Sequence, residues 1–303
     1  MTDILELLNI KVSYNQRLSQ INEILNQTET NYPELNLTIV SSSLNYNQKN
    51  YIITPTGIKN SKRDAKDGIV LFGYERKNKI CDSNLNTDNK EDNNLNTETI
   101  HNLEESEDFL FNDFVFPLEE KEENYGLYEF PNFAIYFDTN DKNYYIKDFN
   151  TGVGALMKIK KYTIEGSTLI NIGSNYIVVN IEKNKIILKI FNNTILENKS
   201  SNENNRKNCD VKEFKIENNK KTSITIGRSK KCNIVIDDVM LSKIHTSIEY
   251  NPKDKKFYLY DGDSQKESTN GTWVFILNPI KINNNFTFKA EHTLFVANLT
   301  NNN

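Results

Sequence analysis

Three short runs in the last third of the chain carry side chains that suit a phosphate group. They are Gly227-Arg228-Ser229, Ser242-Lys243-Ile244-His245 and Thr269-Asn270-Gly271. Phosphothreonine carries about −1.5 to −2 charges and three acceptor oxygens, so its site needs a fixed cation and several short donors. Arg228 supplies a planar guanidinium that matches phosphate, and Lys243 supplies a second cation. Ser229, Ser242 and Thr269 add hydroxyls, so the three runs together predict a phosphopeptide site.

Strand ends and turns hold these residues. Asn270 can both donate and accept, which suits it to holding a peptide main chain from such a turn. The surrounding segments are short runs with a period of two, such as Phe257–Asp261, and turn residues separate them. No helical patterns are interleaved after Pro33. This pattern predicts an all-β fold of sandwiches or barrels, whose rigid strands present binding residues on loops.

The three runs resemble a forkhead-associated (FHA) domain. A Gly-Arg at a strand end, a Ser-x-x-His and a Thr-Asn-Gly-Thr follow each other in the family's order. Each motif alone is weak, but the three in order are specific. The tail departs from the family's common Leu-x-x-Gly-Asp ending, because Phe286-Thr287-Phe288-Lys289-Ala290 stands there instead. The resemblance implies an FHA-type β-sandwich at residues 209–303.

The resemblance also implies a role for each site residue. Arg228 and Ser242 would bind the phosphate directly, and Lys243 fills a position that often faces the phosphate. Thr269 would line the pocket beside the phosphothreonine. Asn270 would bond the peptide main chain just after it. Structural support would come from three residues, Gly227, His245 and Gly271.

A second sandwich is expected at residues 33–191, separated from the first by a polar linker at 192–208. Its strand-like runs are interrupted at 82–108, which is acidic, rich in Asn and typical of a solvated insertion. The predicted organisation is therefore an N-terminal helix at 1–32 followed by two FHA-type sandwiches, with the linker between them.

The first sandwich resembles a divergent copy of the second. Gly73-Tyr74 resembles the family's Gly-Arg, with a tyrosine in place of the arginine. Thr151–Ala155 resembles the Thr-Asn-Gly-Thr run, with Val153 in place of the asparagine, and no Ser-x-x-His lies between. Tyr162–Val179 is similar to the family's last two strands, more so than the end of the second block. We expect this domain to dock or scaffold rather than to bind phosphate.

Residues 2–28 are the best helix candidate. One stripe at helical spacing, interrupted at Lys11, is formed by Ile4, Leu7, Tyr14, Leu18, Ile21 and Leu25. The stripe could pack on the helix's own domain or dock with a partner, and the sequence leaves both readings open.

Composition excludes several classes of protein. The 303 residues carry a net charge of −4, so general nucleic-acid binding through a basic surface is not expected. No apolar run is long enough for a membrane span, and the N-terminus lacks a basic signal region. Cys81, Cys209 and Cys232 share no metal-ligand spacing and cannot make a disulfide framework. We therefore expect a reduced intracellular protein of the cytoplasm or nucleus, with no metal and no cofactor.

The leading hypothesis is a non-catalytic adaptor that binds a phosphothreonine-containing protein. The N-terminal helix and the first domain would join it to a larger complex. The alternative is a purely structural subunit of a large complex, for example a ciliary or microtubule-associated one, with FHA folds as packing modules. An enzyme is not expected, because the sequence has no phosphate-cradling glycine loop, kinase signature or nucleophile elbow.

Overall fold

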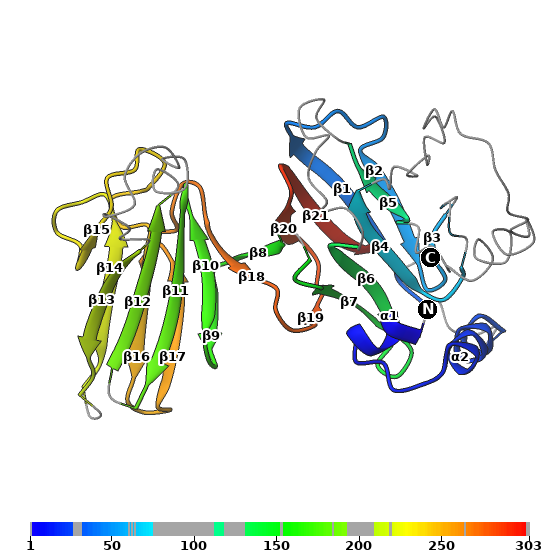
Figure 1. The fold of residues 1–303 in the computed structure, drawn as a ribbon, viewed down its shortest axis with the longest axis horizontal. Helices are drawn as coiled ribbons and strands as arrows, with labels where there is room; N and C mark the ends of the chain where they lie inside the picture. The colour runs from blue at the N-terminus through cyan, green and yellow to red at the C-terminus, as the bar shows by residue number, and fades with distance from the viewer. Residues whose placement is uncertain are drawn as a thin grey trace, which may run out of the picture. The chain divides into compact units, whose positions relative to one another are not determined.

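The computed structural model (Figure 1) is mostly β, with two helices near the N-terminus, which confirms the predicted fold class. It describes residues 2–26, 32–59, 61, 63, 65–74, 112–117, 131–151, 154–183, 185–192, 209–217, 220–263 and 265–300. The chain forms two compact units. Unit 1 comprises Met1–Gly154, Leu277–Asn285 and Glu291–Asn303, and unit 2 comprises Ala155–Ile276 and Phe286–Ala290.

Unit 1 contains two sheets. Its strands are β1 (Glu34–Ser42), β2 (Asn50–Thr54), β3 (Gly57–Ile58), β4 (Ile69–Tyr74), β5 (Phe114–Phe116), β6 (Phe133–Asp138), β7 (Asn143–Asp148), β19 (Ile280–Lys281) and β21 (Thr293–Thr300). One sheet has the order β21-β1-β2-β3 and the other the order β19-β7-β6-β4-β5. Aromatic rings join the two: Phe72 on β4 stacks on Phe133 with ring centres 4.4 Å apart and lies 6.5 Å from Phe295 on β21.

Unit 2 also contains two sheets. Its strands are β8 (Ala155–Ile159), β9 (Lys161–Ile164), β10 (Thr168–Ile172), β11 (Asn175–Glu182), β12 (Lys185–Asn192), β13 (Asp210–Lys215), β14 (Thr222–Gly227), β15 (Ile234–Val235), β16 (Thr246–Asn251), β17 (Lys256–Asp261), β18 (Thr272–Phe275) and β20 (Phe286–Ala290). One sheet has the order β13-β12-β11-β10-β18-β8-β20 and the other the order β15-β14-β16-β17-β9. Its core includes Ile170, Ile226, Ile248, Leu259 and Phe288, all fully buried.

Each unit contains strands that the sequence assigned to the other one, so we call these strands exchanged. The observed units therefore differ from the predicted domains 33–191 and 209–303. Strands β9 and β10, expected in the first domain, pair with β17 and β18 of unit 2, with Leu259 opposite Tyr162. Strand β21, expected in the second domain, pairs with β1 of unit 1, with Leu35 opposite Leu299. Hydrophobic alternation identifies a strand but not its partner, and the partner decides the domain.

The predicted linker at 192–208 is a connection inside unit 2. Residues 193–208 lie outside the described residues, but the strands on either side of them pair with each other. In that pairing, β12 runs antiparallel to β13 with Lys185 opposite Lys215. Strands β10 to β13 thus follow one another as consecutive antiparallel neighbours, and no domain boundary falls between them.

The predicted single helix at 2–28 is two helices, α1 (Thr2–Leu7) and α2 (Tyr14–Asn26). Asn9 ends α1 in the left-handed conformation, with φ of 60°. Ser13 then caps α2 as Ser-x-x-Gln: its amide donates to the Gln16 side chain (2.9 Å), and the Gln16 amide donates to its hydroxyl (3.3 Å). The break falls at the interruption of the apolar stripe.

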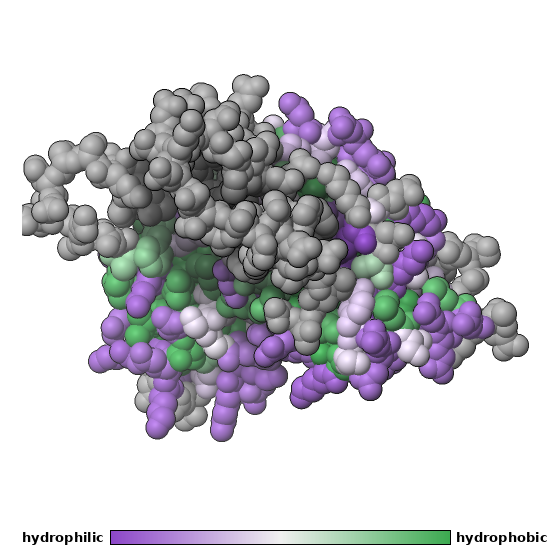
Figure 2. Space-filling model, turned by 45° about the vertical axis from the view of Figure 1, so that its right-hand side comes forward, coloured by the Kyte–Doolittle hydropathy of each residue, from purple (hydrophilic) through white to green (hydrophobic). Residues whose placement is uncertain are grey.

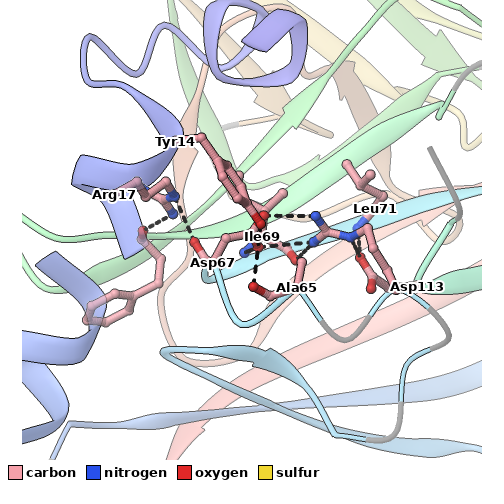
Figure 3. Close-up of polar contacts among 9 residues, drawn as sticks. Tyr14, Arg17, Ala65, Asp67, Ile69, Leu71 and Asp113 are labelled. Carbon is pink, nitrogen blue, oxygen red and sulfur yellow. Dashed lines mark hydrogen bonds and ion pairs between the residues drawn. The ribbon is translucent and has the colours of Figure 1, made fainter. Parts of the chain in front are cut away.

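The helices pack on unit 1, which supports the first of the two readings. Ile4, Leu5 and Leu8 form one apolar cluster with residues of β4 and β6, among them Leu71 and Tyr136. Arg17 of α2 is 1% exposed and donates to the carbonyls of Asp67 (2.7 Å) and Phe137 (2.9 Å). Figure 3 shows Arg17 beside Asp67. A buried guanidinium satisfied by main-chain acceptors ties α2 to its own unit.

A second buried arginine, Arg63, bonds to Asp67 and Asp113, the two aspartates labelled in Figure 3. Arg63 forms ion pairs with Asp67 (2.8 Å) and Asp113 (3.0 Å), and all three side chains are at most 7% exposed. Asp113 also accepts the amide of Leu71 at 2.8 Å. The network fixes the segment before β4 to the segment before β5.

The surface agrees with the low mean hydropathy of −0.64. In Figure 2, hydrophilic residues cover much of the described surface, with hydrophobic residues between them. Among the described residues, neither helix is long and apolar enough to cross a membrane.

Candidate functional site

The first predicted run lies directly after β14, where two backbone segments touch. The amide of Arg228 donates to the carbonyl of Ser242 (3.1 Å), and the amide of Ser229 donates to the carbonyl of Lys243 (3.1 Å). A Cβ on Gly227 would lie 2.5 Å from the Lys243 carbonyl oxygen, so only glycine permits this approach. The contact places the exposed side chains of Arg228 and Lys243 on adjacent loops.

The second and third runs meet through Ser242. Its hydroxyl accepts the amide of Thr269 at 3.0 Å and lies 3.3 Å from the Thr269 hydroxyl. The side-chain amide of Asn270 donates to the carbonyl of Met240 at 2.7 Å. The structure therefore brings Arg228, Ser242, Lys243, Thr269 and Asn270 to one end of unit 2.

Ser229 is a predicted phosphate ligand. In the structure its hydroxyl forms a hydrogen bond within its own turn. The side chain is half-buried, and its oxygen accepts the amide of Lys231 at 3.2 Å. The backbone of Ser229 still helps to join the two loops. Its geometry is that of a turn-stabilising serine more than of a ligand.

His245 lies fully buried beneath the loops. Its Nδ1 accepts the amide of Ser242 at 3.1 Å, and its Nε2 lies 3.0 Å from the carbonyl of Gly271. Because Nδ1 must accept and Nε2 must donate, this arrangement requires the neutral imidazole. Burial lowers the pKa of His245, although the Gly271 carbonyl opposes the shift. The imidazole thus links the Ser242 loop to the turn at Gly271.

Sequence reasoning missed a polar cluster that supports the third run. Asp261, at the end of β17, accepts the hydroxyls of Ser268 (2.5 Å) and Thr272 (2.9 Å), and all three residues are buried. The Ser268 hydroxyl in turn accepts the amide of Gly271 at 2.9 Å, where φ is +80°. The available signal was an aspartate at a strand end followed by hydroxyl residues on both sides of Asn-Gly.

The comparison with protein families decides what this arrangement is. The model of the FHA domain matches residues 224–290. Residues 224–290 are an FHA domain. Such domains generally bind phosphothreonine peptides. No curated protein and no solved structure matches the chain.

The matched segment and the folded FHA domain do not coincide. The match begins in β14 and includes β18, but it omits β8 to β13, which complete the two sheets of unit 2. It also includes residues 277–285, which belong to unit 1. The FHA domain at 224–290 is therefore completed by strands that precede it in the chain.

Strand β4 of unit 1 has the same pairing register with its neighbours as β14 of unit 2. Phe72 lies opposite Phe133 just as Ile226 lies opposite Thr246, and β5 runs parallel to β4 as β15 does to β14. The register therefore places Gly73 at the position of Gly227, and Tyr74 at the position of Arg228. Tyr74 is 9% exposed, so its ring is packed rather than presented.

The position of His245 is taken by Asn132 in unit 1. The amide of Asn132 donates to the carbonyl of Phe72 (2.7 Å) as the amide of His245 donates to Ile226 (2.8 Å). The Asn132 side chain donates to the carboxylate of Glu291 at 2.8 Å. Val153 and the acidic insertion 82–108, both singled out in the sequence, lie outside the described residues.

Among the described residues, no group of three or more His, Cys, Asp and Glu side chains is placed to hold a metal ion. Cys209 and Cys232 are free thiols, and Cys81 lies outside the described residues.

Proposed function

We propose that the chain is a non-catalytic adaptor whose unit 2 binds a phosphothreonine-containing protein. The observation that supports this is the convergence of three separate runs. Arg228 and Lys243 lie on loops joined by two backbone hydrogen bonds, and the Ser242 hydroxyl bonds the Thr269 amide beside them. Two cations and short donors on rigid strand ends match a dianionic phosphate.

Unit 1 would serve as the scaffold of this adaptor. We regard it as a divergent FHA fold, because its strand register repeats that of unit 2 while Tyr74 and Asn132 replace the arginine and the histidine. Docking of a larger complex would then use the surface of unit 1, with α1 and α2 as part of that unit. The alternative, a purely structural role, has its best support in unit 1 for the same reason.

Binding of matched peptides tests the proposal. Fluorescence anisotropy of the full chain should show higher affinity for phosphothreonine peptides from a degenerate library than for phosphoserine or unphosphorylated versions. Arg228→Ala removes a charged donor, worth about 1.5–3 kcal/mol, so affinity should fall by roughly tenfold to a hundredfold. Lys253→Ala is the matched control, because Lys253 is exposed on the turn between β16 and β17.

Either of two results would refute phosphothreonine recognition at this site. One is equal affinity for phosphorylated and plain peptides. The other is a phosphate-dependent gain that survives Arg228→Ala but is lost in a variant of unit 1.

A further inference from the structure

The loop that carries Ser242 and Lys243 is fastened by an aspartate. Asp238 accepts the amide of Met240 on one carboxylate oxygen at 2.8 Å, which shapes the loop tip. Its other oxygen accepts the amide and hydroxyl of Ser174 (3.0 and 2.8 Å) and the side-chain amide of Asn175 (2.8 Å). One carboxylate thus accepts four hydrogen bonds, three of them from the turn between β10 and β11.

That turn is shaped to receive the carboxylate. Gly173 has φ of +55°, and a Cβ there would lie 2.6 Å from the Asp238 oxygen and 3.0 Å from Leu241. Asn171 braces the turn by donating to the carbonyl of Asn175 at 3.1 Å. Burial raises the pKa of Asp238, but hydrogen bonds from Ser174, Met240 and Asn175 outweigh it and lower the pKa. The carboxylate is therefore charged near neutral pH.

The fastened loop continues directly into the phosphate site. The carbonyl of Met240 accepts the side chain of Asn270, and the next residue, Leu241, is 2% exposed. The amide of Ser242 then donates to His245. Between them, Asp238 and His245 hold both ends of the short segment that presents Ser242. The tip is otherwise exposed, since Val239 is 91% and Met240 52% accessible.

The fastening turn comes from outside the matched FHA segment. Ser174 and Asn175 precede Asp238 by 64 and 63 residues and belong to the strands expected in the first domain. Strand β10 enters unit 2 by pairing with β18, with Asn171 opposite Trp273. The exchanged strands therefore supply hydrogen bonds to the phosphate-site loop as well as apolar surface to the core.

We propose that Asp238 is a positioning residue for phosphothreonine binding, and that Ser174 and Asn175 in the β10–β11 turn complete the site by fixing it. This inference rests on the proposed function of unit 2. Asp238 acts through the loop: it sets the Met240 carbonyl that holds Asn270 and the path of the chain into Ser242. Preorganised donors lose less entropy when a ligand binds, so a released loop binds more weakly.

The test compares Asp238→Asn with Asp254→Asn in the full chain. Asp254 is a matched control, because its carboxylate also accepts several bonds, from Asn251 (3.0 Å), Lys256 (3.1 Å) and Tyr258 (2.6 Å), in a turn distant in sequence from the site runs. The probe is the phosphothreonine peptide that binds the full chain best. We expect Asp238→Asn to lower affinity about tenfold and Asp254→Asn to leave it unchanged. Wild-type affinity in Asp238→Asn would overturn the inference.

A double-mutant cycle separates positioning from general support. Ser174→Ala removes only an exposed hydroxyl and should lower affinity by about twofold to fivefold. In a Ser242→Ala background the same change should have little further effect, because its action passes through that loop. Additive losses would overturn the inference.

Hydrogen exchange distinguishes a failure of this inference from a failure of the proposed function. The amides of Met240 and Ser242 should exchange faster in Asp238→Asn than in the wild type, without any ligand. If the wild-type chain shows no phosphate-dependent binding, the proposed function fails while this exchange still tests the fastening. If Arg228→Ala abolishes binding and Asp238→Asn does not alter it, only the present inference fails.

Discussion

The ends of β4 and β14 have the same geometry and different chemistry. β14 ends at Gly227, and β4 has Gly73 as its second-last residue. Each strand pairs with a short parallel strand on one side and with a longer antiparallel strand on the other. At β14 the next residue is the exposed Arg228, whereas at β4 the corresponding residue is the packed Tyr74. The comparison shows that two strands can share a pairing register while the residues that follow their glycines differ in charge and exposure.

The faces of the two strands differ for a related reason. All six residues of β4 are buried, while β14 alternates between more exposed and buried positions from Ser223 to Ile226. Helix α1 packs on the β4 sheet through Ile4, Leu5 and Leu8, so both faces of β4 need apolar side chains.

The largest expected effect concerns the exchanged strands. A fragment of residues 209–303 should have no cooperative unfolding transition, because it lacks the partners of β17, β18 and β13. Residues 155–290 retain both sheets of unit 2 and should fold. Urea unfolding followed by fluorescence of Trp273, the single tryptophan, measures both fragments. Cooperative folding of 209–303 would contradict the exchange.

The exchange also marks what could be read from the sequence. The sequence motifs that carry Arg228, Ser242 and Asn270 are local, and the structure brings these three runs together. Their role as ligands of a phosphopeptide stays a prediction. The strands themselves were predictable from their alternation and turns. The partners of β9 and β10 were not, because pairing across the chain depends on the relative free energies of alternative sheets, which no local pattern reports.

The other features that the sequence did not predict, in the site and in unit 1, also depend on residues distant in sequence or on burial. Ser174 and Asp238 are 64 residues apart, and neither residue type is unusual in a turn. The burial of Arg17 and Arg63 depends on the fold, since no local pattern around them distinguishes them from exposed arginines. The helix break was the exception, since Ser13-x-x-Gln16 is a local capping signal that the apolar stripe obscured.

The next effect compares how much the buried ion pairs of unit 1 and a more exposed ion pair of unit 2 contribute to the free energy of unfolding. Arg63→Ala leaves Asp67 and Asp113 buried without their cation, which should cost about 3–5 kcal/mol in the free energy of unfolding. Lys221→Ala removes an exposed pair with Glu249 and should cost at most about 1 kcal/mol. Circular dichroism in urea measures both variants. Equal losses would show that the network around Arg63 adds nothing to unit 1.

A smaller effect is expected from placing an arginine in unit 1. Tyr74→Arg buries a charge beside Phe116, whose ring lies 5.7 Å from that of Tyr74, and should cost about 1–3 kcal/mol. It should not create phosphothreonine binding in an Arg228→Ala background, because Asn132 is bonded to Glu291 there. Tyr74→Phe is the control that keeps the ring. Recovered phosphopeptide affinity would mean that this one side chain accounts for the difference in phosphopeptide binding between the two units.

The smallest effect is a pH dependence that we expect from His245 in unit 2. Burial lowers the pKa of His245 below its usual value of about 6.5, so the unfolded chain binds a proton more readily than the folded one. Stability from this group is therefore present above about pH 6.5 and is lost as pH falls from there toward the lowered folded pKa.

Protonation would also place a hydrogen on Nδ1, where the Ser242 amide already donates. Asn132 holds the same register position in unit 1 and cannot titrate, so that position of unit 1 contributes no such loss. In urea unfolding followed by Trp273 fluorescence, the midpoint urea concentration should fall as the pH is lowered from 7.5 to 5.5. The variant His245→Asn should make this midpoint less dependent on pH. A midpoint that rises with acid, or a slope unchanged in His245→Asn, would mean that the imidazole does not hold the Ser242 loop in its neutral form.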